Sequence, residues 1–205
     1  MIANFLRPPS APLEWAADGI RVLGLLSVVI AFIWWEVTDA GILALALPTI
    51  LVPRFLGARA SFDIVYGAVV SIAAWSNVLG LYRAISWWDL AVHFAATGLI
   101  AAMLYLALRR AGVVPPGTAP RRVALVLVTT IGLAISAVWE MIEWLGKAFI
   151  SPDIFVTYDD TVGDMVFGGL GALAAAVVVA RTRIERTGSV ESPAVGRKED
   201  AWQSN

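Results

Sequence analysis

Cysteine is absent from this 205-residue chain, and histidine occurs once. The first absence excludes disulfides, thiolate nucleophiles and cysteine metal ligands, and the second excludes a zinc site built from three histidines. Charged residues are also scarce, at 15% of the chain, where about 25% is usual in soluble proteins. The chain therefore lacks the polar surface that a soluble domain of this size requires.

Apolar side chains are abundant instead. They make up 59% of the residues, and the mean hydropathy is +0.77, which excludes a disordered chain. A helix needs about 20 mostly apolar residues to cross the hydrocarbon core of a bilayer. The sequence predicts an all-α fold: a polytopic membrane protein with a bundle of six transmembrane helices in residues 1–183, followed by a flexible cytoplasmic tail over 184–205. The expected spans lie near 18–35, 40–52, 64–82, 87–108, 123–146 and 162–180.

The second expected span, 40–52, is the shortest and contains Pro48. It is expected either to cross at a tilt or to be broken and partly re-entrant. With this span included, all of the 15 Lys and Arg residues except Arg83 and Lys147 fall on one side of the membrane. The positive-inside rule then places both termini in the cytoplasm. Without the second span, loops rich in basic residues would no longer alternate with loops poor in them. The charge distribution therefore supports this span independently of its hydropathy.

Acidic residues gather at the opposite, outer ends of the spans, beside several tryptophans typical of an aromatic belt. Several share helix faces through spacings of three or four residues. Few cations lie near them in the sequence, so a metal ion, bound protons or a watery cavity must offset their mutual repulsion. Carboxylates with one imidazole suit hard or borderline divalent ions such as Mg²⁺, Mn²⁺, Fe²⁺ or Zn²⁺. The polar residues expected at this depth are Asn77, Asp89, His93, Glu140, Glu143, Asp160 and Asp164.

The leading hypothesis is an outward-facing, metal-dependent hydrolase or transferase that acts on an envelope lipid or lipid-linked precursor. Asp89 would orient the metal-binding histidine, and Asn77 would support the same layer. Glu143 or Asp160 would act as general base toward water. Membrane lipids are the expected partners, and no nucleic acid is expected. Three side chains are expected to bind the metal: His93, Glu140 and Asp164.

Two other functions remain open. The acids could belong to a non-catalytic scaffold, because Ser86-x-x-Asp89 and Thr161-x-x-Asp164 have capping-box spacing and Glu143 is spaced to pair with Lys147. Intramembrane acids also mark proton- or cation-coupled transporters. Against transport, the sequence predicts no matching polar groups in the inner halves of the helices and contains no inverted repeat.

The last expected span is rich in small residues, including Gly168, Gly169 and Gly171, with Ala172 and Ala176 further along. Small residues let neighbouring membrane helices approach closely. Close packing of this span would hold the acidic layer together.

The stretch Asp89-Leu90-Ala91-Val92-His93-Phe94 resembles the Asp-x-x-x-His-Phe signature of the YjdF-like family of small polytopic proteins. The stretches 139–144 and 159–165 are similar to two further signatures of that family. The resemblance covers roughly residues 15–180 and implies a multi-pass protein of the bacterial inner membrane, without specifying a reaction. More remotely, residues 85–175 are similar to VanZ-like proteins, which are associated with glycopeptide-antibiotic tolerance. Glu143 departs from the VanZ-like pattern, which usually has Gln there.

Overall fold

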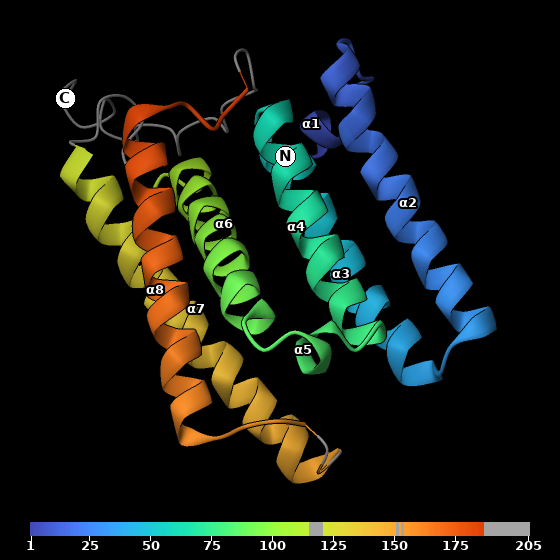
Figure 1. Cartoon of the computed structure of the whole chain (residues 1–205). Helices are drawn as coiled ribbons and strands as arrows, with labels where there is room; N and C mark the ends of the chain where they lie inside the picture. The colour runs from blue at the N-terminus through green and yellow to red at the C-terminus, as the bar shows by residue number, and fades with distance from the viewer. Residues whose placement is uncertain (115–120, 151, 153, 187–205) are drawn as a thin grey trace, which may run out of the picture.

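The computed structural model describes residues 1–114, 121–150, 152 and 154–186, and this part of the chain is built from α-helices (Figure 1). The all-α prediction is confirmed. In chain order the helices are α1 (Ile2–Leu6), α2 (Pro12–Trp34), α3 (Val37–Leu56), α4 (Ala60–Val78), α5 (Leu81–Ala84), α6 (Trp88–Arg110), α7 (Arg121–Phe149) and α8 (Tyr158–Arg181).

Six of these helices are long and apolar enough to cross a membrane: α2, α3, α4, α6, α7 and α8. Each corresponds to one expected span. The doubtful second span is one continuous helix of 20 residues, α3, which runs through both Pro48 and Pro53. The third span ends earlier than expected, at Val78, because Gly80 adopts a left-handed conformation with φ of 67° and starts the separate short helix α5.

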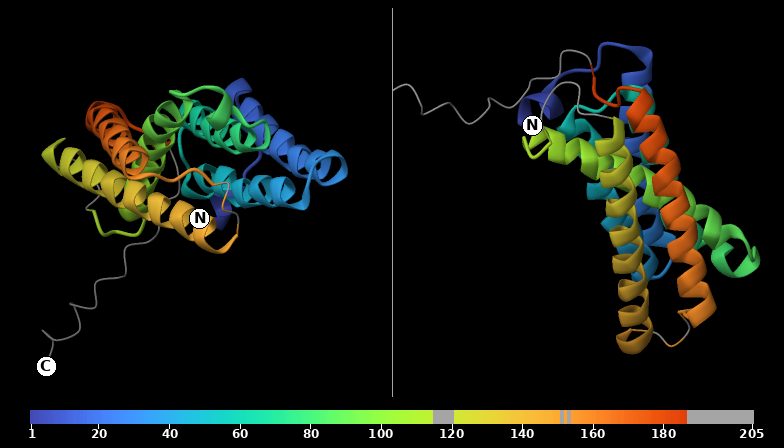
Figure 2. Two further views of the ribbon diagram at one scale, coloured as in Figure 1. Left: turned by 60° about the horizontal axis from the view of Figure 1, so that its bottom comes forward. Right: turned by 90° about the vertical axis from the view of Figure 1, so that its left-hand side faces the viewer.

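The membrane helices form two groups of three. Helices α2, α3 and α4 pack on one another, as do α6, α7 and α8, and α6 joins the groups through contacts with α3 and α4. Figure 2 shows the two groups side by side. The junction contains a hydrophobic core that includes Ile50, Tyr66 and Leu106.

Helix α8 packs closely against α6 and α7 through small residues, as the sequence predicted. A methyl group added at Gly171 would lie 1.8 Å from the carbonyl oxygen of Phe94 on α6, and one added at Gly98 would lie 2.5 Å from the carbonyl oxygen of Gly171. On the α7 side, a methyl group at Gly132 would lie 2.1 Å from the Ala172 Cβ atom. The approach of α8 to α6 is therefore backbone to backbone, and that of α7 to α8 is backbone to a methyl group, so a larger side chain at these glycines would separate the helices.

The chain after α8 returns to the loop between α3 and α4. The Arg59 N–H donates to the Ile184 carbonyl oxygen at 2.7 Å, and the Arg186 N–H donates to the Gly57 carbonyl oxygen at 3.0 Å. Residues 184–186, assigned above to the flexible tail, are thus held by backbone hydrogen bonds. The rest of that expected tail, 187–205, lies outside the described residues.

Candidate functional site

The candidate site lies where α6 begins, α7 ends and α8 begins, near the lower end of the view in Figure 1. His93 is in the second turn of α6, Asp164 is in the second turn of α8, and Glu140 lies near the end of α7. His93 and Asp164 are 0% exposed and Glu140 is 5% exposed. The fold therefore brings together, in a buried position, the three side chains expected to bind a metal.

His93 stands between carboxylates on either side of its ring. Its Nε2 atom lies 3.5 Å from the Asp89 Oδ1 atom, and its Nδ1 atom lies 4.0 Å from the Glu140 Oε1 atom. Neither ring nitrogen has a hydrogen-bond partner among the described residues. The Trp139 ring packs against the imidazole with a centroid separation of 5.0 Å. The ring is thus fixed by packing, with both nitrogens available.

Two groups of potential ligand atoms meet at His93. Asp89, His93 and Asp164 form one group, and His93, Glu140 and Glu143 form the other; within each group the ligand atoms lie within 4.8 Å of one another. The expected ligand set of His93, Glu140 and Asp164 is therefore divided between the two groups. Asp89 and Glu143, which were expected to orient the histidine and to act as a base, also belong to these groups of potential ligands.

The buried carboxylates lack partners. Both carboxylate oxygens of Glu140 and of Asp164 have no hydrogen bond within the described part of the chain. Thr161 lies beside Glu140 but does not make a hydrogen bond of standard geometry. Buried polar groups are almost always paired, because an unpaired one costs about 1–3 kcal/mol or more. This cluster therefore needs a cation, protons or water to be stable.

Small and hydroxyl-bearing residues form the inner boundary of the site. One helical turn further into the membrane, the Thr97 and Ser136 hydroxyls face Gly168, where an added methyl group would lie 3.1 Å and 2.0 Å from them. Both hydroxyls are buried and unpartnered in the described residues. The turn beyond holds the closely packed Gly132 and Ala172. The two hydroxyls were not among the residues predicted for the site. Each lies four residues from His93 or Glu140, a spacing that places it on the same helix face.

Asn77 is not brought into the site. It is exposed on α4, which belongs to the other group of three helices, so equal depth did not place it near His93. Its buried neighbour Ser76 instead accepts a hydrogen bond from the Trp88 Nε1–H at 2.8 Å. The sequence alone did not specify which helices are neighbours.

Asp160 is half-buried at the start of α8. Its backbone N–H donates to the Thr157 Oγ1 atom at 3.3 Å, so Thr157 caps a helix that begins earlier than the expected span. Asp164 is therefore a buried residue rather than part of a Thr161 capping box. The alternative in which Ser86 caps α6 is also contradicted, because Trp87 is the residue that precedes α6 and it makes no side-chain capping hydrogen bond.

Glu143 and Lys147 do not form the expected ion pair among the described contacts. Glu143 accepts a hydrogen bond from the Trp139 Nε1–H at 2.9 Å, and the Lys147 ammonium group donates to the Val156 carbonyl oxygen at 2.9 Å. Tyr82, on α5, lies near these acids. Burial, with Asp89 and Glu143 nearby, raises the pKa of the Tyr82 phenol, which donates a hydrogen bond to the Ala73 carbonyl oxygen.

A second polar cluster lies at the other end of the molecule. Arg21 on α2 binds both carboxylate oxygens of Asp63 on α4, at 2.7 and 2.6 Å, and these side chains are only 9% and 8% exposed as residues. The prediction that the inner halves of the helices lack polar groups is therefore wrong. Mutual neutralisation allows these charges to be buried. Their separation of 42 residues left no periodic pattern in the sequence.

The family model described as predicted membrane protein (DUF2238) matches residues 20–185, which include the whole candidate site. The chain belongs to this family. It is the YjdF family, so the resemblance in the sequence signatures is confirmed, while the similarity to VanZ-like proteins stays a prediction. Comparison with curated proteins and with solved structures gives no match. Membership of the family establishes a membrane protein and leaves its function to be inferred from the site.

Proposed function

We propose that this chain is a metal-dependent enzyme of the membrane interface, with a divalent ion bound at His93, that acts on an envelope lipid or lipid-linked precursor. One observation carries the proposal: both nitrogens of His93 and all four carboxylate oxygens of Glu140 and Asp164 are buried without hydrogen-bond partners in the described chain. Oxygen ligands with one imidazole fit Mg²⁺, Mn²⁺, Fe²⁺ or Zn²⁺.

The geometry favours the Nε2 side of His93 for the ion, with Asp89 and Asp164 as the other ligands. Two donors that share a divalent ion, each about 2.1 Å from it, stand about 3–3.5 Å apart. The His93 Nε2 to Asp89 Oδ1 distance of 3.5 Å agrees with this separation. The Nδ1–H would then face Glu140, as ligating histidines usually face a carboxylate that fixes their tautomer.

Glu143 is oriented by the Trp139 indole and is a suitable general base toward water. The ion would polarise a phosphoryl or carbonyl oxygen of the substrate. The Asp89 side chain is 29% exposed, so a substrate would reach the buried His93 beside Asp89. The exposed Trp87 and Trp144 mark this end as a membrane–water interface, the depth at which lipid headgroups lie.

The experiment is to measure the metal content of detergent-purified protein by mass spectrometry. Wild type should hold about one divalent ion per chain, and His93→Ala and Asp164→Asn should lose it. Asp159→Asn is the matched control, because Asp159 is an exposed carboxylate of the same helix. Folding is checked by size-exclusion chromatography. Folded wild type without metal, even after reconstitution with Mn²⁺ and Zn²⁺, would contradict the proposal.

Proton- or cation-coupled transport is the second candidate, and the buried Arg21–Asp63 pair favours it by placing ionisable groups in the inner half of the membrane region. That pair and the candidate site lie in different groups of three helices, however. Flux into proteoliposomes that disappears in Glu140→Gln would favour transport over the enzyme. If the chain is a scaffold, Glu140→Gln would instead impair only folding or assembly.

A further inference from the structure

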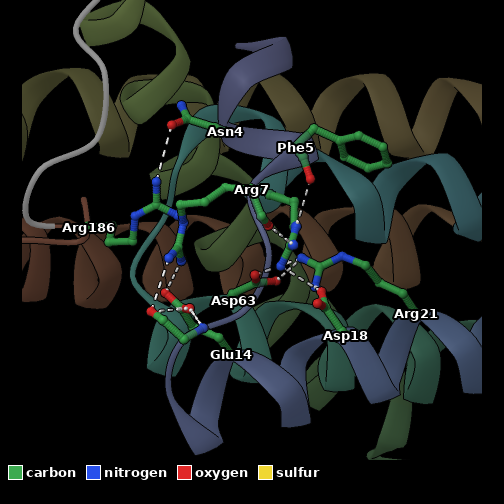
Figure 3. A network of polar contacts seen from close by, with 10 residues as sticks. Asn4, Phe5, Arg7, Glu14, Asp18, Arg21, Asp63 and Arg186 are labelled. Atoms are coloured by element: carbon green, nitrogen blue, oxygen red, sulfur yellow. Dashed lines mark hydrogen bonds and ion pairs between the residues drawn. The ribbon is translucent and has the colours of Figure 1, made fainter.

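A polar cluster lies at the end opposite the candidate site (Figure 3). Its ion pairs and hydrogen bonds join one guanidinium group more than carboxylates. We call it the basic cluster. It joins the starts of α2 and α4 to the end of α3 and to the chain after α8. Its charged members are Arg7, Glu14, Asp18, Arg21, Arg54, Asp63 and Arg186.

All three carboxylates of the basic cluster already have arginine partners. Asp63 pairs with Arg21 at 2.6 Å. Asp18 lies between two guanidinium groups, at 2.9 Å from Arg21 and 2.8 Å from Arg54. Glu14 pairs with Arg7 and also accepts hydrogen bonds from Ser10.

Arg186 is the cation that remains. Its guanidinium group donates to the Asn4 Oδ1 atom at 3.2 Å, and no carboxylate of the described residues lies within ion-pair distance of it. Its backbone N–H is fixed to the Gly57 carbonyl oxygen, so the residue is held in place. Burial lowers the pKa of Arg186, and the nearby Arg7, Arg54 and Arg110 lower it further, while Glu14 opposes them.

A small hollow lies beside this unpaired cation. Arg7, Arg54 and Arg186 line it together with Glu14 and Asp63, and the small residues Ala17, Gly57, Ala58 and Ala60 complete its wall. The Arg7 Nε–H is buried and has no partner among the described residues. Arg7 and Arg186 thus both line the hollow, and the guanidinium group of each has N–H groups beyond the hydrogen bonds described above.

We propose that the hollow of the basic cluster binds a phosphate group, held mainly by Arg186 and Arg7. The planar guanidinium group matches phosphate oxygens in geometry and supplies charge-assisted hydrogen bonds. The cluster lies at helix ends, where phospholipid headgroups are found. The adjacent α1 exposes Met1, Ile2 and Leu6, as a helix in the membrane interface does. The phosphate belongs either to an anionic lipid headgroup or to a free phosphate.

The first test uses wild-type protein in non-ionic detergent. Thermal unfolding is compared in sodium phosphate and sodium chloride of equal ionic strength, and then with added phosphatidylglycerol or phosphatidylcholine. A rise in melting temperature with inorganic phosphate identifies a free phosphate site. A rise with phosphatidylglycerol alone identifies a lipid headgroup site. No rise with either ligand, relative to chloride and phosphatidylcholine, overturns the proposal.

The second test compares Arg186→Gln with Arg183→Gln, which removes the same charge from an exposed residue three positions away. Arg186→Gln should weaken binding of the stabilising phosphate compound roughly tenfold or more, because one charge-assisted hydrogen bond is lost. Arg183→Gln should bind as wild type does. Equal losses in both variants would indicate general charge attraction and overturn the proposal. If Arg186→Gln does not fold, Arg186→Lys is compared with Arg183→Gln instead. Arg186→Lys keeps the charge but should also weaken binding, because lysine lacks the planar guanidinium group.

Discussion

At the scale of single residues, the candidate site is built from charges that destabilise one another in the absence of a ligand. Glu140 and Asp164 are buried, and their carboxylate oxygens have no hydrogen bond in the described chain. If the cluster binds an ion as proposed, the groups that bind it also lower the stability of the ion-free protein. Removing one charge should therefore raise the stability of the ion-free protein and weaken ion binding.

The Glu140→Gln variant tests both effects. Its metal-free form should melt at a higher temperature than metal-free wild type, by about 2–4 °C for each kcal/mol of repulsion removed. Wild type with Mn²⁺ or Zn²⁺ should be stabilised more than the variant, because the carboxylate that faces Nδ1 is gone. Melting curves with and without the metal measure both effects. A metal-free variant that is less stable than wild type would show that Glu140 has a structural partner.

The Arg21–Asp63 pair gives a second prediction at this scale. Arg21→Ala should lower the free energy of unfolding by about 3–5 kcal/mol, because it leaves the Asp63 carboxylate buried and unpaired. The double variant Arg21→Met/Asp63→Leu should recover most of that loss, since neither charge then remains. Unfolding in a denaturing detergent titration measures both values. A double variant as unstable as the single one would mean that packing rather than charge sets the cost.

At the scale of elements, α8 controls the geometry of the site through its contact with α6. Gly171 lies against the carbonyl group of Phe94, the residue that directly follows His93 in the sequence. Gly171→Ala should destabilise the protein by about 1–3 kcal/mol through overpacking and should also weaken metal binding by moving Asp164 away from His93. Gly163→Ala is the matched control, because a methyl group there meets only Leu90, at an ordinary 3.4 Å. Equal effects of the two substitutions would mean that the loss comes from glycine removal in general.

At the scale of the whole molecule, the distribution of basic residues predicts that both termini face the cytoplasm. The absence of cysteine makes a direct test simple. A single cysteine at Asp159 should react with a membrane-impermeant maleimide in intact cells that have a permeabilised outer membrane, and one at Arg183 should react only after the inner membrane is opened. Both positions are exposed. The reverse labelling pattern would mean that both termini lie on the outer side of the membrane.

Much of this fold could be predicted from the sequence, because spans, helix faces and depth follow from hydropathy and from the spacing along a helix. His93, Glu140 and Asp164 were predicted to share a layer for that reason. The pairing of helices is a tertiary property, so depth alone did not place Asn77 outside the site or divide the ligands into two groups around His93. The Arg21–Asp63 pair was missed because it joins residues of two different helices.

The backbone contact between Arg186 and Gly57 has a consequence for the order of assembly. Synthesis proceeds from the N-terminus, so α2, α3 and α4 enter the membrane while Arg186 has not yet been made. The basic end of the first three helices therefore stays incomplete until Arg186 has left the ribosome. The contact between Arg186 and Gly57 can form only after all six of the described membrane helices have been synthesised.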